Sequence, residues 1–311
     1  MSHDRPMARI ITRTDALAKG YTDSELRQWC RAGEYTRLHR GSYTLSRDLQ
    51  GLTDVERHLI LARAVLARST AADSVLSHVS AAIAHNIDVW NVPLGTVQLT
   101  RNRRSGGRKD ARRQVHAAPY DEDEVCEVDG LRVTTPTRTI ADLACSLPFE
   151  EAVCAADDAA RRLGVTGADV AALLERRPGR AGHPRARRVA RFMDGCAESV
   201  GESRSRVLLH EAGFTPSLQR VLNCGNNNYR VDFFLDESNV VGEFDGRVKY
   251  GRLVPSGDTP ADVLWREKLR EDRLRDAGYE IARWTWADLR IPAAVVERVS
   301  RAQARSAARS M

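Results

Sequence analysis

The sequence has little that would cross-link it covalently or hold it in a membrane. Its six cysteines are scattered over 311 residues and form no C-x-x-C pair, which disfavours both a disulfide framework and a zinc site. The opening MSHDRPMARI is charged and has no apolar h-region, so we expect no signal peptide. The longest apolar stretch, residues 59–66, is interrupted by Arg63 and is too short to cross a bilayer. These absences predict a cytoplasmic protein with buried, reduced cysteines.

Aromatic residues are also scarce, at 6% of the chain, so its cores must consist mainly of leucine, valine and alanine. The chain is 42% hydrophobic and 29% charged, which is ordinary for a folded globular protein. Its formal net charge is +6 and its pI about 9.2, with arginine far outnumbering lysine. A basic balance is compatible with nucleic-acid binding, although many basic proteins bind none.

Turn signals and apolar periodicity predict an α+β protein organised in three blocks. Residues 1–47 are expected to form short helices and a β-ribbon, residues 51–175 a mixed α/β middle domain, and residues 194–304 a third domain. Residues 176–193 should be a linker, because 176–191 contain seven arginines, two prolines and no acid.

The first block, TRTDALAKGYTDSELRQWCRAGEYTRLHRGSYTL, predicts two helices, a tight connection and a ribbon. Thr12 can cap the first helix, and Gly20 can end it in a left-handed conformation. Thr22 and Glu25 form a capping box for the second helix, which Gly33 ends. Two helices and a basic ribbon are the layout of a winged helix-turn-helix, which places one helix in the major groove and a wing on the backbone.

In that interpretation the polar side of the second helix and the tip of the ribbon contact DNA. The alternative is a small helical subdomain with a solvated basic face. The residues expected to contact DNA are Arg27, Gln28, Arg31, Arg37 and Arg40.

The block resembles the N-terminal domain of AbiEi-type antitoxins, the DNA-binding members of type IV toxin–antitoxin pairs. The resemblance continues less sharply through LSHVSAAIAH and VDGLRVTTPTRTIADLA. It implies that the protein represses its own operon and opposes a nucleotidyltransferase-like toxin.

The middle block carries a basic stretch whose role the sequence leaves open. Seven basic residues from Arg101 to Arg113 surround SGG, with Asp110 as the one acid. Both a phosphate-binding segment and a solvated loop are consistent with this pattern. His78 and His85 share one face of a predicted helix. We expect them to be core or surface histidines, because this is a simpler explanation than metal ligation. Asp129-Gly130 predicts a hairpin turn, and Thr135-Pro136 a helix start.

The third block predicts the order helix, strand, strand, strand, helix, strand. Residues 229–235 and 240–244 alternate polar and apolar around the turn residues DESN, which predicts a hairpin. If Leu235 pairs with Val240, Asp232 lies directly opposite Glu243. Two carboxylates facing each other across strands repel, and a divalent cation would turn that cost into a binding site.

We expect Val231, Phe233, Leu235, Val240 and Phe244 on the buried face of this hairpin. Asp232, Glu243 and Asp245 should then lie on its polar face, as in a sheet with one buried side. An ordinary surface hairpin is the alternative.

The order of elements and the acids resemble the PD-(D/E)XK nuclease superfamily, and within it the domains related to very-short-patch-repair endonucleases. The matching stretches are GESRSRVLLHEAGFTPSLQ, YRVDFFLDESNVVGEFDGRVKY and WREKLREDRLRDAGYEIARWTWADL. The resemblance implies an Mg²⁺- or Mn²⁺-dependent DNA endonuclease in which Asp232, Glu243 and Glu202 bind the metal. The resemblance also implies that Gln219 lines that site and that Arg266, Arg270 and Arg273 contact the DNA backbone.

One departure from the superfamily puts turnover in doubt. Asp245 stands where the pattern has a lysine two residues after the glutamate, so Lys249 or Lys268 would have to supply the catalytic charge. Glu202 could instead pair with Arg206 on its own helix, and Lys268 could be a solvated helix residue. Trp284 and Trp286 are expected to pack rather than stack on bases.

Two functions therefore follow from the sequence. The first is a DNA-binding protein whose C-terminal domain cleaves DNA with a divalent metal. The second is an AbiEi-like antitoxin and transcriptional autorepressor whose nuclease fold is inert. The fold alone does not choose between them.

Overall fold

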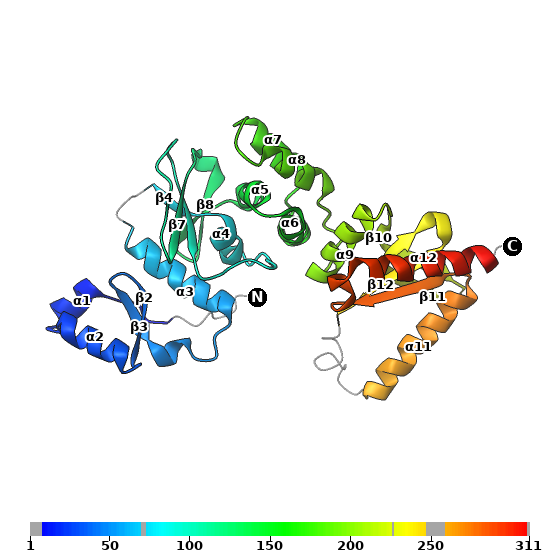
Figure 1. Ribbon diagram of the computed structural model, residues 1–311, viewed down its shortest axis with the longest axis horizontal. Coiled ribbons are helices and arrows are strands. Elements are labelled where there is room, and N and C mark those ends of the chain that lie inside the picture. The colour runs from blue at the N-terminus through cyan, green and yellow to red at the C-terminus, as the bar shows by residue number, and fades with distance from the viewer. Residues whose placement is uncertain (1–7, 70–72, 226, 247–258, 310–311) are drawn as a thin grey trace. The chain divides into compact units, whose positions relative to one another are not determined.

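The computed structural model describes residues 8–69, 73–225, 227–246 and 259–309 (Figure 1). It is an α+β protein, as predicted, and its described strands form three β-sheets. The chain forms two compact units, one of residues 1–155 and 165–191, the other of residues 156–164 and 192–311. The predicted blocks 1–47 and 51–175 thus belong to one unit, except for residues 156–164, which belong to the other. Within the described ranges no helix is long and apolar enough to span a membrane.

The first unit begins with the two helices and the ribbon that the sequence predicts. Thr12 and Thr22 each form a complete capping box, with Asp15 and Glu25 respectively. The ribbon turns at Gly41, whose φ of +73° suits glycine. The elements are β1 (Ile11–Thr12), α1 (Arg13–Ala18), α2 (Asp23–Arg31), β2 (Tyr35–His39) and β3 (Ser42–Leu45), with sheet order β1-β3-β2.

The ribbon and the middle block share one hydrophobic core. Leu38 of β2 and Leu49 are buried in the same cluster as Leu61 and Val65 of α3 (Asp54–Ala67) and Leu99 of β5 (Val97–Arg101). Burial of apolar surface is the main stabilising term in folding. The ribbon is therefore held in place by the middle block and does not fold around a separate core.

The middle block is a six-stranded sheet, in the order β6-β7-β5-β4-β9-β8, with helices packed on it. The predicted hairpin joins β8 to β9 through Asp129 and Gly130, both at positive φ, and Thr135 caps α5 with Pro136 in the first turn. The strands are β4 (Ser74–Leu76), β5 (Val97–Arg101), β6 (Arg108–Lys109), β7 (Arg113–Ala117), β8 (Val125–Val128) and β9 (Leu131–Thr134). The helices are α4 (His78–Ala84), α5 (Pro136–Ser146), α6 (Phe149–Leu163), α7 (Gly167–Glu175) and α8 (His183–Phe192).

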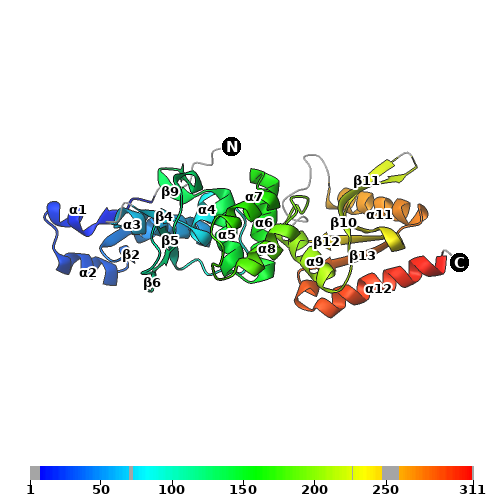
Figure 2. The same ribbon diagram turned by 90° about the horizontal axis from the view of Figure 1, so that it is seen from above.

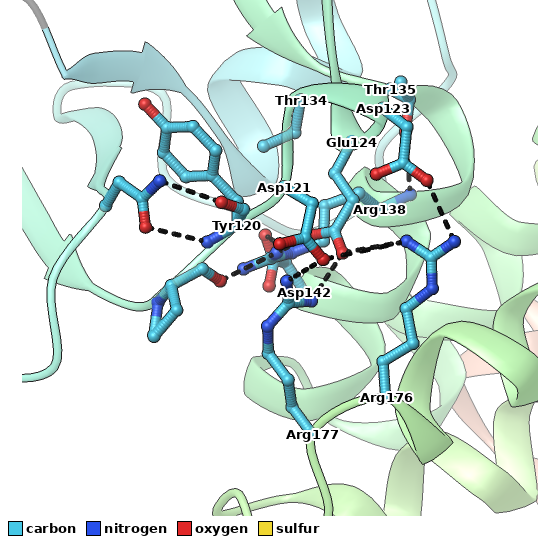
Figure 3. A network of polar contacts seen from close by, with 12 residues as sticks. Tyr120, Asp121, Asp123, Glu124, Thr134, Thr135, Arg138, Asp142, Arg176 and Arg177 are labelled. Atoms are coloured by element: carbon cyan, nitrogen blue, oxygen red, sulfur yellow. Dashed lines mark hydrogen bonds and ion pairs between the residues drawn. The ribbon is translucent and has the colours of Figure 1, made fainter.

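The segment predicted to be a linker is ordered structure, which corrects the sequence interpretation. It contains α8, and its arginines bind acids far away in the chain (Figure 3). Arg176 and Arg177 bind the turn at residues 121–124, and Arg180 binds Asp142 on α5 at 2.6 Å. Arginine richness here reflects pairing with distant carboxylates, which composition cannot reveal.

The second unit has the predicted order of elements around a four-stranded sheet, β10-β11-β12-β13. Neighbouring strands are antiparallel except β12 and β13, which are parallel. Figures 1 and 2 show α11 and α12 on opposite sides of the strands. The elements are α9 (Val200–Glu211), β10 (Ser217–Cys224), β11 (Asn227–Leu235), β12 (Val240–Asp245), α11 (Pro260–Asp276), β13 (Glu280–Thr285) and α12 (Pro292–Arg309).

Both faces of this sheet are buried, whereas one buried face was expected. Phe233, Leu235, Val240 and Phe244 share a core with residues of α9 and α12, as predicted. Val231 instead packs with Phe234, Val241 and Leu274 of α11 on the other face. The alternation of β11 therefore breaks between Val231 and Phe233, at Asp232.

Candidate functional site

Four polar residues lie in a row across the sheet of the second unit. The predicted pairing of Leu235 with Val240 is confirmed, and the last paired residues of the two strands are Phe233 and Gly242, next to Asp232 and Glu243 in sequence. Glu243 in turn neighbours Arg283 on β13. Gln219 lies between two residues of β10 that pair with Phe233 and Val231, and therefore opposite Asp232.

Gln219 has a φ of +49° inside a strand. That conformation is costly for a residue with a side chain and is found most often at functional positions. It directs the Gln219 amide to Glu202, with Nε2 donating to Oε2 at 2.9 Å. The hydrogen bond of Gln219 thus links α9 to the sheet.

The row opens into a cavity of about 450 Å³. Asp232, Glu243 and Asp245 come from the hairpin, and Glu202 comes from α9. The remaining lining residues are Glu198, Gln219, Arg230, Phe244, Gly246, Val263, Glu267, Arg270 and Arg283. The cavity therefore brings together the acids that the sequence singled out.

Glu202 is buried and fixed by the start of its own helix. Its carboxylate accepts hydrogen bonds from the Glu198 backbone N–H at 2.9 Å and the Ser199 hydroxyl at 2.8 Å. Ser199 caps α9 in return. The expected alternative, a pair with Arg206, does not form, because Arg206 binds Asp157 at 2.7 Å. With the Gln219 bond added, Glu202 is held by three donors.

Asp232 is oriented by the neighbouring strand. Its Oδ2 accepts a hydrogen bond from the Phe244 backbone N–H at 3.0 Å. This side chain–backbone bond aims the carboxylate at β12, next to Glu243.

Two arginines occupy both oxygens of Glu243. Arg270 of α11 donates through Nη2 to Oε1 at 2.6 Å, and Arg283 donates through Nε to Oε2 at 2.9 Å. Arg283 also binds Glu271 at 3.1 Å, and Arg270 binds Glu267 at 3.1 Å. Burial lowers the pKa of both guanidiniums, but the hydrogen bonds and negative charge of Glu243 and its neighbours outweigh it and raise the pKa above its ordinary value.

These contacts do not fit a divalent cation as the side chains stand. A metal needs free carboxylate oxygens that converge, whereas each oxygen of Glu243 carries a guanidinium. Among the described acids, cysteines and histidines, the group of three whose ligand atoms lie within 4.8 Å of one another is Asp121, Asp123 and Glu124. That trio is itself bound by Arg176 and Arg177 (Figure 3). The repulsion between Asp232 and Glu243 is thus relieved by arginine.

The expected lysines do not reach the cavity in the part of the chain that is described. Lys268 is exposed on α11 and is not among the lining residues, and Lys249 lies outside the described residues. Arg266, Arg270 and Arg273 line a neighbouring cavity of about 520 Å³. Arg273 there donates to the Tyr229 hydroxyl at 2.8 Å.

In the first unit, all five residues expected to contact DNA are exposed: Arg27, Gln28, Arg31, Arg37 and Arg40. Helix α2, which carries the first three, is fixed by buried Leu26 and by Trp29. The Trp29 ring contacts Tyr21 and Tyr35, with ring centroids 5.0 and 5.5 Å away. This packing turns the polar side of α2 outward.

The two histidines of LSHVSAAIAH are structural, as expected. His85 Nε2 lies 2.7 Å from the Thr134 carbonyl oxygen. His78 is buried and stacks on His116 at 3.8 Å, and burial lowers its pKa to about 3. Both rings are accounted for by local packing.

Sequence reasoning missed Arg283, which lies in the row and neutralises Glu243. The signal was present in YEIARWTW, because Arg283 alternates with the buried Ala282 and Trp284. The alternation of polar and apolar residues did not predict that β13 pairs with β12 and so places Arg283 beside Glu243.

Comparisons with known proteins supply relatives without a described function. No family model matches the chain. It is 29% identical over 177 residues to the uncharacterized proteins Rv2248 and MT2308 of two Mycobacterium tuberculosis strains, a match of 56% of this chain. The chain spans 62% of the length of these relatives. A crystal structure of the RV2827C protein of Mycobacterium tuberculosis superposes with a TM-score of 0.41 at 18% identity, covering 66% of this chain and 76% of that one.

Proposed function

We propose that the protein binds duplex DNA through a winged helix-turn-helix formed by α1, α2 and the β2–β3 ribbon. The observation that carries this proposal is the outward, exposed face of α2 with Arg27, Gln28 and Arg31. A capped helix presenting two guanidiniums and an amide has the donors that read base edges in the major groove. The basic ribbon beside it can contact phosphates.

The proposal is tested by titrating the full chain against a duplex from its own promoter, with fluorescence anisotropy as the readout. Changing Arg27→Ala together with Arg31→Ala should weaken binding at least tenfold, because each good base contact is worth about 1–3 kcal/mol. Arg301→Ala is the matched control, since Arg301 is an exposed helical arginine of the other unit. Equal affinity of the double variant and the wild-type protein would refute the proposal.

The regulatory role we propose is that of an AbiEi-like antitoxin that represses its own operon, with a nucleotidyltransferase-like toxin as partner. Binding to its own promoter is the shared requirement of that role. A promoter–reporter fusion should be repressed by the wild-type protein and derepressed by the Arg27→Ala, Arg31→Ala variant. Co-expression with a nucleotidyltransferase encoded next to its gene should relieve that enzyme's toxicity.

In this proposal the C-terminal domain has a PD-(D/E)XK-like fold whose acidic centre is closed by Arg270 and Arg283. Support comes from the missing lysine at Asp245 and from the engagement of both Glu243 oxygens. The domain would then serve binding and not cleavage.

Metal-dependent cleavage of DNA is the second candidate, and the row from Gln219 to Glu243 is the observation that favours it. Cleavage would require Glu243 to lose its two arginines first. The test is to incubate the protein with plasmid in the presence of Mg²⁺ or Mn²⁺ and, in parallel, in the presence of EDTA. Nicking that needs the metal and disappears in Asp232→Ala and Glu243→Ala would establish the enzyme; intact plasmid under all conditions would leave the binding role.

A further inference from the structure

A groove in the first unit lies between the ribbon and the β6–β7 hairpin of the middle block. It has a volume of about 560 Å³ and includes Arg37 and Arg40 of the ribbon on one side. Arg108, Arg112 and Arg113 of the hairpin face them, although they are about seventy residues away in sequence. We call this the basic groove.

Its positive charge is barely compensated. Asp110 is the acid in the lining, and it accepts hydrogen bonds from the Arg113 guanidinium at 3.2 Å and the Arg112 backbone N–H at 3.1 Å. Arg37, Arg40, Arg108 and the Arg112 side chain form no ion pair with any described residue. Four guanidiniums are therefore available to an anion.

Two polar atoms in the groove's walls are buried without a partner in the described structure. They are Nδ1 of His39 and Nε of Arg113. Most buried polar atoms in proteins are hydrogen-bonded, so such exceptions call for a missing partner. Burial, and to a smaller extent the positive charge of Arg113, lowers the pKa of His39.

The groove continues the surface that the helix-turn-helix presents. The Arg68 guanidinium reaches the ribbon turn, with its Cζ 3.8 Å from where a Cβ on Gly41 would lie. In Figure 2, α2, β2 and β6 follow one another along the same edge of the unit. A duplex lying on α2 and the ribbon would meet the hairpin next.

We infer that the basic groove binds the phosphodiester backbone of duplex DNA beside the segment read by α2, with Arg108 and Arg112 as phosphate contacts. The inference rests on the proposed function and extends the DNA contact surface into the middle block. Guanidiniums match phosphate oxygens in geometry and charge. Contacts of this kind fix the position of the protein on DNA and carry no sequence information.

The test uses the full chain with two duplexes of equal length, one from its own promoter and one unrelated, between about 50 and 200 mM salt. Each lost phosphate contact should reduce the slope of log affinity against log salt by about 0.9. The variant Arg108→Ala, Arg112→Ala should therefore lower the slope by about 2 on both duplexes and weaken binding to both by the same factor. Arg108→Lys with Arg112→Lys keeps the charges and should retain most of the slope.

The matched control is Arg103→Ala with Arg104→Ala, which removes two exposed arginines of the same basic stretch that do not line the groove. An equal loss of slope in this control would overturn the inference in favour of general loop charge. Unchanged binding of the groove variant, while Arg27→Ala, Arg31→Ala loses binding, would overturn the groove and leave the proposed function standing. If neither variant changes binding, both fail.

Discussion

Two clusters of arginines and carboxylates, one in each compact unit, differ in how far water reaches them. Around Arg138 the partners Glu124 and Asp142 have side chains 2% and 0% exposed (Figure 3). Around Glu243 the partners Arg270 and Arg283 are 21% and 33% exposed and face a cavity. The first cluster can only hold the unit together, whereas the second can exchange its partners with a ligand.

Energetics explain the difference. A buried charge that loses its partner keeps the full desolvation cost, because no water replaces the partner. A half-exposed charge recovers much of its solvation. Burial, and not the identity of the residues, thus decides which network is structural. A series of substitutions ordered by burial tests that difference.

The largest effect is expected at the buried end, for Arg138→Met. It leaves Asp142 and Glu124 with fewer cations in a dry site, so the unfolding free energy should fall by about 3–5 kcal/mol. Urea unfolding followed by circular dichroism measures it. Arg132→Ala, a change of an arginine with a 44% exposed side chain in the same block, should cost about 0–1 kcal/mol. A similar loss of unfolding free energy in both variants would contradict the expected difference between buried and exposed ion pairs.

The pH dependence of the buried region gives the second effect. The pKa of His78 is about 3 in the folded protein, because burial disfavours the charged ring, against 6.5 when unfolded. The unfolded state therefore binds the proton first as pH falls, and stability decreases below about pH 6.5. One such proton contributes a slope of up to about 1.4 kcal/mol per pH unit.

The variant His78→Asn should reduce that slope between pH 5 and 7.5. Asparagine suits the position, because His78 has a φ of +51° and asparagine tolerates left-handed backbone. Thermal unfolding at a series of pH values provides the readout. A slope unaltered in His78→Asn would place the titrating group elsewhere.

An intermediate effect is expected for Glu243→Gln at the open cluster. Arg270 and Arg283 retain Glu267 and Glu271 as partners, and water reaches them, so we expect a loss of about 1–2 kcal/mol. Urea unfolding of the full chain, followed by tryptophan fluorescence, measures the change. If the loss of unfolding free energy were as large as for Arg138→Met, the cavity beside Glu243 would exclude water as a buried core does.

The smallest effect belongs to the exposed pair Arg187 and Glu175, whose side chains are 42% and 62% exposed. Glu175→Gln should lower stability by less than about 1 kcal/mol, and added salt should abolish the difference. The comparison needs the same unfolding assay at low and high ionic strength. A larger loss of stability that salt does not change would show that the exposure of an ion pair does not determine its contribution to stability.

Local structure could be predicted from the sequence to a useful extent. The capping boxes at Thr12 and Thr22, the turn at Asp129-Gly130 and the pairing of Leu235 with Val240 all follow from contacts within a few residues. Such signals are short-ranged, because a cap or a tight turn is satisfied within one or two turns of the chain.

Long-range partners could not be predicted in the same way. Glu243 meets Arg270 and Arg283, which are 27 and 40 residues away, and Arg206 meets Asp157, which is 49 residues away. The basic groove joins segments that are further apart still. These pairings depend on which elements pack together, and no local periodicity encodes that.

Sequence alone predicted the capped helix starts at Thr12 and Thr22, the turn at Asp129-Gly130 and the acidic hairpin, because those features depend on near neighbours. The three-dimensional packing was needed to show that arginines fill the acidic centre and that the supposed linker contains a helix bound to distant acids. The physical reason is that an ion pair forms wherever packing brings opposite charges together out of water, regardless of their separation along the chain.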